Sequence, residues 1–367
     1  MTASVETLHS TESFWSGCRA CVLGGNGFLG RHIVAALLAR GARVRTLSLP
    51  GPPDDSHPEL ETRTGDVTDR AAVRDAMAGA RVVFLAAGPV GGGRHAAGVM
   101  NAHTAAVDCV LDELPTNARL VLTSSVVAVG AGHGAVLTED SVFPNSNLKV
   151  GYVRAKRAAE DRALAAARRR DLVVVNPGYL FGPNDPGPSV MGRLCVRFWR
   201  GNLLLPPPGG INVVDVRDVA VGHLLAAEHG AAGRRYILGG ANVTFAELFA
   251  GLARAAGLRR AVLPGFRPAL PGPALWLLGA LGELGARVTG KPSDVSLELA
   301  RLFRLKWFAS SARAEAELGF RVRPLADTLA DAFAWHAGRT RVAPRGLNRL
   351  WLRTDRSAVP RGPDVAV

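Results

Sequence analysis

Residues 21–38 read Cys21-Val22-Leu23, then Gly24-Gly25-Asn26-Gly27-Phe28-Leu29-Gly30, then Arg31-His32-Ile33-Val34-Ala35-Ala36-Leu37-Leu38. The first run predicts a buried strand and the last a helix, so the glycines stand at a strand-to-helix turn. Glycine permits this tight turn and lets the backbone approach a pyrophosphate, whose charge meets the free N–H groups at the helix N-terminus. We therefore predict a dinucleotide site, with cofactor-binding residues Gly24, Gly27, Phe28, Leu29 and Gly30.

The alternation of strand-type and helix-type runs continues to about Val175. The runs lie at residues 21–23, 30–40, 44–47, 71–78, 82–85, 99–114, 120–122, 152–168 and 172–175. Uniformly apolar strands alternating with helices are typical of a parallel sheet covered on both faces. The predicted fold class is therefore α/β, a doubly wound parallel sheet with a smaller C-terminal substrate-binding lobe.

Beyond Pro177 the chain changes character, because prolines and glycines divide it into short elements. Helices are expected at 219–228, 245–256 and 293–303. We predict four segments: an N-terminal extension (1–17), a cofactor domain carrying the catalytic residues (18–180), a substrate lobe with some segments returning to the first domain (181–338), and a flexible basic tail (339–367).

The composition excludes several classes of protein. The 367 residues are 48% apolar and 20% charged, which excludes a disordered or fibrous chain. The net charge is +13, but residues 339–367 alone hold seven Arg and two Asp, and no aromatic-interleaved basic stripe or zinc-finger spacing indicates a nucleic-acid partner. Four cysteines, no export signal and no apolar stretch long enough to span a bilayer favour the cytoplasm.

The end of the second strand should determine which nicotinamide cofactor binds. Ser48 stands there instead of an acid that would repel a 2′-phosphate, and Arg31 and Arg45 are basic candidates, so NAD and NADP both remain open. Farther on, Asp66 and Val67 are expected to contact the adenine, and Thr68 or Asp69 is expected to cap the next helix. Helix capping alone could also explain the polar residues at positions 66–69.

A second set of residues carries the chemistry. Tyr152-Val153-Arg154-Ala155-Lys156 places a phenol and an ammonium four residues apart, on one helix face, where Lys156 is expected to lower the pKa of Tyr152. Ser125 lies 27 positions before Tyr152, at the end of a predicted strand, and could donate a hydrogen bond to a substrate carbonyl. Tyr and Lys are ordinary helix-surface residues, so the prediction depends on their combination with Ser125 and the glycine loop.

Together these residues resemble the extended short-chain dehydrogenase/reductase family, over roughly Arg19 to His336. The resemblance implies a Rossmann domain and bound NAD(P). It also implies that Ser125 orients the substrate, that Tyr152 exchanges a proton with it, and that Lys156 binds the nicotinamide ribose and tunes Tyr152, so Tyr152 and Lys156 are predicted to contact the cofactor as well. It implies a fourth polar helper at Asn101, although the expected N-x-x-G-T pattern reads Asn101-Ala102-His103-Thr104-Ala105. Further cofactor contacts are implied after two strands, at Ala86, Ala87, Pro177 and Gly178.

Departures from the family bear on the substrate. Sugar-nucleotide epimerases commonly carry an Arg that grips the substrate diphosphate, where this chain has Ile211. Residues 264–288 are instead apolar, with Leu270, Leu275, Trp276, Leu277, Leu278 and Leu281 at near-helical spacing. This segment is interpreted as a helix packed on its own core, a lid over an apolar substrate, or a peripheral membrane contact, for which the basic tail is a second candidate. In the family it resembles the hydroxysteroid, dihydroflavonol and hopanoid-associated branches.

Three hypotheses follow. The first is an oxidoreductase that interconverts a secondary alcohol and a ketone on a steroid-, terpenoid- or flavonoid-like small molecule. The second is a nucleotide-sugar epimerase or dehydratase with transient oxidation, in which Arg193, Arg197 or Arg200 replaces the missing clamp. The third, a cofactor-sensing protein without turnover, is disfavoured by the intact catalytic residues. The resemblance also implies a homodimer through helices 99–114 and 152–168, and the scattered His103, His133 and His223 indicate no metal site.

Overall fold

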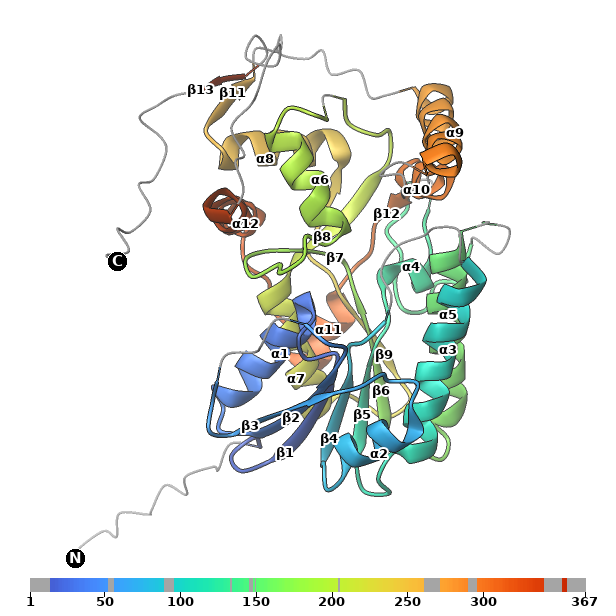
Figure 1. Ribbon diagram of the computed structural model, residues 1–367, viewed down its shortest axis with the longest axis vertical. Helices are drawn as coiled ribbons and strands as arrows, with labels where there is room; N and C mark the ends of the chain where they lie inside the picture. The colour runs from blue at the N-terminus through green and yellow to red at the C-terminus, as the bar shows by residue number, and fades with distance from the viewer. Residues whose placement is uncertain are drawn as a thin grey trace, which may run out of the picture.

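The structure, a computed structural model, describes residues 14–51, 56–88, 96–132, 134–144, 148, 150–203, 205–260, 271–289, 296–339 and 352–354. Its main layer is a seven-stranded parallel sheet in the order β3-β2-β1-β4-β5-β6-β9 (Figure 1). The strands are β1 (Arg19–Leu23), β2 (Arg43–Ser48), β3 (Leu60–Thr64), β4 (Val82–Leu85), β5 (Arg119–Thr123), β6 (Leu172–Pro177) and β9 (Arg235–Leu238). This order confirms the predicted doubly wound α/β fold.

Helices cover both faces of the sheet, which explains why its central strands β1, β4, β5 and β6 are mostly apolar, whereas the edge strand β3 is polar and exposed. On β1, Ala20 and Val22 point into the core under α1 (Phe28–Leu38), α7 (Val216–His229) and α11 (Ala312–Leu318). Cys21 and Leu23 point into the opposite core. That face is covered by α2 (Arg70–Met77), α3 (Ala96–Glu113) and α5 (Gly151–Ala166). Cys18 and Cys21 are buried and free, as small apolar residues of a strand would be.

The end of the predicted N-terminal extension packs on this domain. Trp15 is fully buried in the α1 and α7 core, its ring centroid 6.0 Å from that of Phe84, and its indole N–H donates to Glu228. Phe14 and Trp15 therefore contribute to the large core.

The second lobe has its own core and a small sheet in which β10 (Ala241–Thr244), β12 (Lys306–Trp307) and β7 (Tyr179–Phe181) all pair with β8 (Gly210–Asp215). Its helices are α6 (Val190–Trp199), α8 (Phe245–Ala255), α9 (Gly272–Thr289), α10 (Leu297–Phe303) and α12 (Leu325–Arg339). Far from the large sheet, β11 (Leu258–Arg260) pairs with β13 (Leu352–Thr354). In the part of the chain that the structure describes, no helix is long and apolar enough to cross a membrane.

Several predicted boundaries were wrong by a few residues. Asn176 and Pro177 were expected after the sixth strand but are its last two residues, because their backbones still pair with β9. The helix expected at 293–303 is α10, which begins at Leu297 where the Ser296 side chain caps it. Of the predicted basic tail, the described residues are Arg339, at the end of α12, and β13.

Candidate active site

The glycine loop forms a cradle that fits a pyrophosphate. Gly24 has φ +94°, and a Cβ there would lie 2.7 Å from the backbone nitrogen of Ala87. A Cβ at Gly30 would overlap the carbonyl oxygen of Gly24. Gly27 precedes α1 without any side-chain cap, so the first N–H groups of this eleven-residue helix are free to bind an anion. Ala86 and Ala87 follow β4, and Ala87 lies against Gly24 of the loop; their cofactor contacts remain a prediction.

The predicted adenosine end is partly occupied by internal contacts. Ser48 Oγ accepts the Asn26 backbone N–H at 3.1 Å, which ties β2 to the glycine loop. Arg45 binds Glu61 at 2.6 Å and donates to carbonyls at the end of α2, so its guanidinium is already engaged in contacts outside the glycine loop. Arg31 donates to Asn26 O at 3.1 Å, and its buried Nε has no hydrogen-bond partner among the described residues. The choice between NAD and NADP therefore stays open, with Arg31 the basic residue still beside the loop.

The acidic residues after β3 divide into two local roles. Asp69 caps α2 by accepting from the N–H groups of Ala71 and Ala72, as the sequence predicted. Asp66 accepts from the N–H and hydroxyl of Thr68 at 2.8 and 2.7 Å. The adenine contact expected at Asp66 and Val67 remains a prediction.

The structure brings Ser125, Tyr152 and Lys156 together where β5 ends. Ser125 is the N-cap of the short helix α4 (Val126–Val129), two residues beyond the end of β5, and its side chain lies beside Tyr152, whose pKa it lowers. Tyr152 lies in the first turn of α5, where its backbone N–H donates to Glu298 Oε1 at 3.2 Å. Lys156, one turn later, donates to the Thr123 carbonyl at 3.1 Å.

Burial shifts the pKa values of Tyr152 and Lys156 in opposite directions. It raises the pKa of Tyr152 to about 12, and the Ser125 hydrogen bond only partly opposes this. It also lowers the pKa of Lys156 to about 8, against the attraction of the Glu160 carboxylate. The expected direction of the Tyr152 pKa shift was therefore wrong for this structure: the pKa is raised, because loss of water around the phenol outweighs any stabilisation of the phenolate by Lys156.

Sequence reasoning missed a buried polar network beneath these residues. Glu160 is fully buried and accepts from Ser124 Oγ at 2.5 Å, Asn176 Nδ2 at 2.6 Å and Arg235 Nη1 at 3.0 Å. Asn176 Nδ2 also donates to the Ser125 carbonyl at 3.0 Å. The signal was present as Glu160, one further helical turn beyond Tyr152 and Lys156 on the same face.

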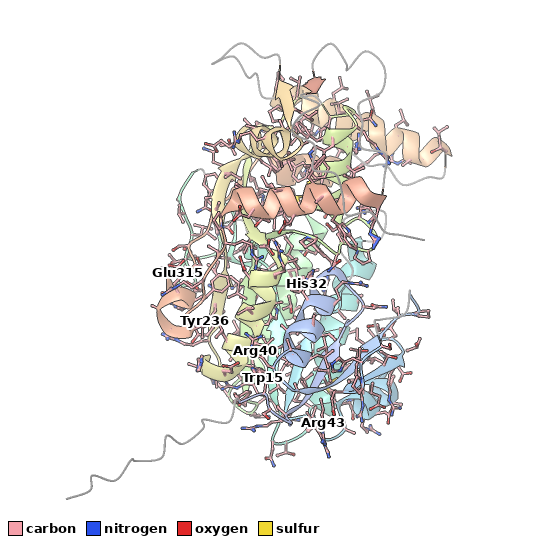
Figure 2. All side chains as sticks on the ribbon, turned by 90° about the vertical axis from the view of Figure 1, so that its left-hand side faces the viewer. Trp15, His32, Arg40, Arg43, Tyr236 and Glu315 are labelled. Carbon is pink, nitrogen blue, oxygen red and sulfur yellow. The ribbon has the colours of Figure 1, made fainter. Side chains whose placement is uncertain are left out.

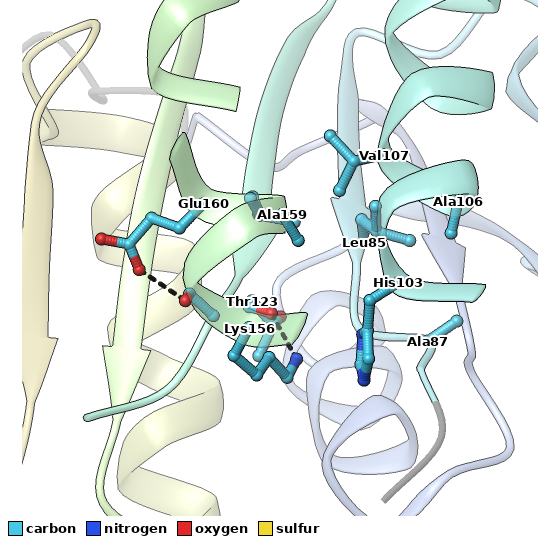
Figure 3. A pocket seen from close by; sticks show the side chains of 11 residues that line it. Leu85, Ala87, His103, Ala106, Val107, Thr123, Lys156, Ala159 and Glu160 are labelled. Carbon is cyan, nitrogen blue, oxygen red and sulfur yellow. Dashed lines mark hydrogen bonds between the residues drawn. The ribbon is translucent and has the colours of Figure 1, made fainter. Parts of the chain in front are cut away.

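A second missed residue is His103, which the sequence considered only as a metal ligand. The imidazole is buried, its centroid 6.1 Å from that of the Tyr152 ring, and it packs against the backbone at Gly88. With Lys156 it lines a cavity of about 10 Å³ between α3, α5 and β5 (Figure 3). That volume is close to the minimum for one water molecule. Asn101, the predicted helper, lies on α3 two positions earlier, and its side chain is outside the described residues.

Other sequence candidates occupy structural positions. Ile211 is fully buried between β10 and β12, and its apolar side chain offers no charge or hydrogen-bond donor to a diphosphate. Gly178 continues β6 into β7 and packs against Asn212. Among the residues that the structure describes, which exclude His133, no three His, Cys, Asp or Glu side chains gather around a metal position.

The comparisons with known proteins decide the family. The model of the NAD dependent epimerase/dehydratase family matches residues 20–239. The chain belongs to this family. It is 30% identical over 343 residues to a Synechocystis sp. protein named "Putative dihydroflavonol 4-reductase", covering 88% of this chain and 96% of that one. It is 30% identical over 334 residues to sterol demethylase protein B of Methylococcus capsulatus, covering 87% and 98%.

Solved structures agree with the fold. The crystal structure of gox2253 has a TM-score of 0.73 and 28% identity, covering 88% of this chain and 98% of that chain. dTDP-glucose 4,6-dehydratase from Bacillus anthracis, solved with NAD, has a TM-score of 0.67 and 14% identity, covering 89% and 98%, which shows a common fold alone. As a member of the epimerase/dehydratase family, the protein is an NAD(P)-dependent enzyme.

Substitution of Gly30 tests the cradle. We expect Gly30→Ala to weaken NAD(P)H binding at least tenfold, because the new Cβ would push the Gly24 carbonyl out of position. Fluorescence titration measures this affinity. Gly187→Ala is the matched control, since a Cβ there meets nothing within 4 Å, and its affinity should equal that of the wild type. Equal NAD(P)H affinities of Gly30→Ala and Gly187→Ala would contradict the assignment of the glycine loop as the cofactor site.

The lowered pKa of Lys156 predicts a pH dependence. Below about pH 8 the amine is charged and attracts the anionic cofactor; above it the amine is neutral. Cofactor affinity should therefore fall as pH rises through about 8, by up to about tenfold per unit. Titrations on either side of pH 8 measure this, with Lys156→Met as the comparison. A slope that survives in Lys156→Met would assign the titration to another group.

Proposed function

We propose that the protein interconverts a secondary alcohol and a ketone on a largely apolar substrate, using NAD(P). The observation that carries this proposal is the juxtaposition of Ser125, Tyr152 and Lys156 at the same sheet edge as the glycine cradle. In this proposal residues 18–180 hold the cofactor and the catalytic groups, and the lobe formed mainly by residues 181–338 holds the substrate.

Ser125, Tyr152 and Lys156 have separate roles in the proposed reaction. Bound NAD(P) supplies or accepts a hydride at its nicotinamide ring. Ser125 Oγ donates a hydrogen bond to the substrate oxygen, and Tyr152 Oη gives that oxygen a proton during reduction. Its raised pKa keeps the phenol protonated at neutral pH, which suits a proton donor. Lys156, charged below about pH 8, stabilises the phenolate that remains and contacts the nicotinamide ribose.

Two observations support an apolar substrate. Tyr152 and Tyr179 are partly buried against the second lobe's apolar core, and the pKa of Tyr179 is raised by burial. The position that binds a diphosphate in sugar-nucleotide enzymes is the buried Ile211. Two relatives carry names that point to flavonoid- or sterol-like substrates, dihydroflavonol 4-reductase and sterol demethylase protein B, and a third is bovine sterol-4-alpha-carboxylate 3-dehydrogenase, 28% identical over 232 residues.

The alternative is a nucleotide-sugar epimerase or dehydratase, which the family description favours. Identification of the nucleotide released by acid from freshly purified protein separates the two. Protein that emerges empty and binds NADH or NADPH reversibly supports the proposed reductase, and a panel of apolar ketones and alcohols then measures turnover. Near-stoichiometric retained NAD would overturn it in favour of the alternative.

We further propose a homodimer in the reducing cytoplasm. α3 and α5 lie side by side over one face of the sheet, available to pair across a two-fold axis (Figure 1). All four cysteines are free and buried, which suits a reducing compartment. Light scattering at micromolar concentration should give a dimeric mass, and a monomeric mass would contradict the dimer.

A further inference from the structure

Helix α9 carries an apolar stripe on its outer side. Leu277, Leu281, Leu284 and Val288 recur at spacings of four, three and four residues, so they form one line along the helix. Trp276 and Leu278 flank this line. All six side chains are between 48% and 79% exposed. Such a concentration of exposed large apolar residues usually marks an interaction surface.

The opposite side of α9 already packs on the second lobe, so the stripe is not the side of the helix that belongs to the core. Leu275 is buried in the second lobe's core, and a Cβ at Gly279 would lie 3.1 Å from the backbone of Leu297. Glu283 Oε1 accepts the Leu297 N–H at 3.0 Å, joining α9 to α10. The inner side of the helix thus packs on the protein while the stripe faces away.

Two segments of the sequence carry most of the chain's net positive charge, and the described residues of the first include Arg287 on α9 and Arg301 and Arg304 on α10 and its C-cap. Residues 254–306 contain nine Lys and Arg against three Asp and Glu, and residues 339–367 contain seven Arg against two Asp. These two segments thus hold eleven of the chain's thirteen net positive charges. Their described helix and strand elements α9, α10, β11 and β13 lie at one end of the molecule (Figure 1), and the same end is uppermost in Figure 2.

We propose that the apolar stripe of α9 docks this end of the protein on an anionic lipid bilayer. An apolar helix face beside basic residues is the pattern of a helix that lies in the membrane interface, where both burial and attraction to anionic lipids contribute. A second copy of the chain is disfavoured as the occupant, because pairing two such ends would bring their positive charges together. The described helices do not span a bilayer, so the contact is peripheral.

The docking is independent of the proposed substrate, but it has a structural link to the site. Leu275 of α9 belongs to the same apolar core against which Tyr152 packs. A bilayer under α9 would therefore lie next to the lobe proposed to hold the substrate.

Flotation with vesicles tests the proposal on the full chain. We expect binding to vesicles of phosphatidylcholine with phosphatidylglycerol, weaker binding to phosphatidylcholine alone, and loss at high salt. Leu281→Glu combined with Leu284→Glu should lower the partition coefficient at least tenfold. The control is Val142→Glu combined with Val322→Glu, which adds the same charge at exposed apolar residues elsewhere and should remain within about twofold of the wild type. Circular dichroism and NAD(P)H binding verify that each variant folds.

Trp276 supplies a second readout that does not depend on those variants. Its indole is half exposed on the same face, so anionic vesicles should shift the wild-type tryptophan emission to the blue, and Trp276→Phe should abolish most of the shift. Absence of binding to anionic vesicles, or equal losses in the α9 and control variants, would overturn the proposal. The proposal would also be overturned if the wild type and the control variant were dimers and the variant with Leu281→Glu and Leu284→Glu were a monomer. That result would show that the stripe binds a second copy of the chain.

Discussion

Replacement of Tyr152 by phenylalanine is expected to lower kcat by about 10²- to 10⁴-fold, the contribution of a positioned general acid. The change removes only the hydroxyl beside Ser125 and keeps the ring that packs against the second lobe's core, so fold and cofactor affinity should persist. Steady-state kinetics on the substrate found in the ketone and alcohol panel give kcat, and fluorescence titration gives the cofactor affinity.

Tyr179→Phe is the matched control for this change. Tyr179 also packs against the second lobe's core, and burial and the nearby Tyr152 both raise its pKa. It has no place in the proposed proton transfer, so we expect kcat to fall by less than about tenfold. If Tyr152→Phe keeps a tenth of the wild-type rate, or if both variants lose activity equally, Tyr152 is not the acid.

The second large effect is expected at Glu160. Glu160→Ala should lower the free energy of unfolding by about 3–5 kcal/mol, because Arg235 would stay largely buried without its carboxylate and two further donors would lose their acceptor. Thermal unfolding should show a decrease in Tm on the order of 10 °C. The Lys156 and Ser125 regions share this network, so kcat should fall as well.

Asp161→Ala is the control, one residue along the same helix. Asp161 makes an exposed ion pair with Arg157 four residues earlier, which is worth only about 0.3–0.5 kcal/mol. Its Tm should stay close to that of the wild type. Glu160→Gln keeps an acceptor without the charge, and we expect intermediate stability. A Glu160→Ala variant as stable as Asp161→Ala would show that Arg235 finds water or another partner.

Local sequence patterns determined the main architecture and half of the site. The glycines at a strand-to-helix turn, the apolar strands and the four-residue spacing of Tyr152 and Lys156 act over short distances, so the parallel sheet with helices on both faces and the position of the cofactor cradle could be predicted. Ser125 could be predicted as well, because a strand end in a parallel sheet always faces the ligand edge.

Only the tertiary structure decided the rest, because it depends on residues far apart in the sequence. Glu160 meets Arg235 across 75 positions, and Tyr152 meets Glu298 across 146. No local pattern reports such pairs. The pKa of Tyr152 likewise depends on how much water the surrounding lobe removes, which reversed the expected direction. The sequence also marked residues 264–288 as apolar, but packing alone determined that the stripe on α9 faces outward, because Leu275 and Gly279 anchor the other side.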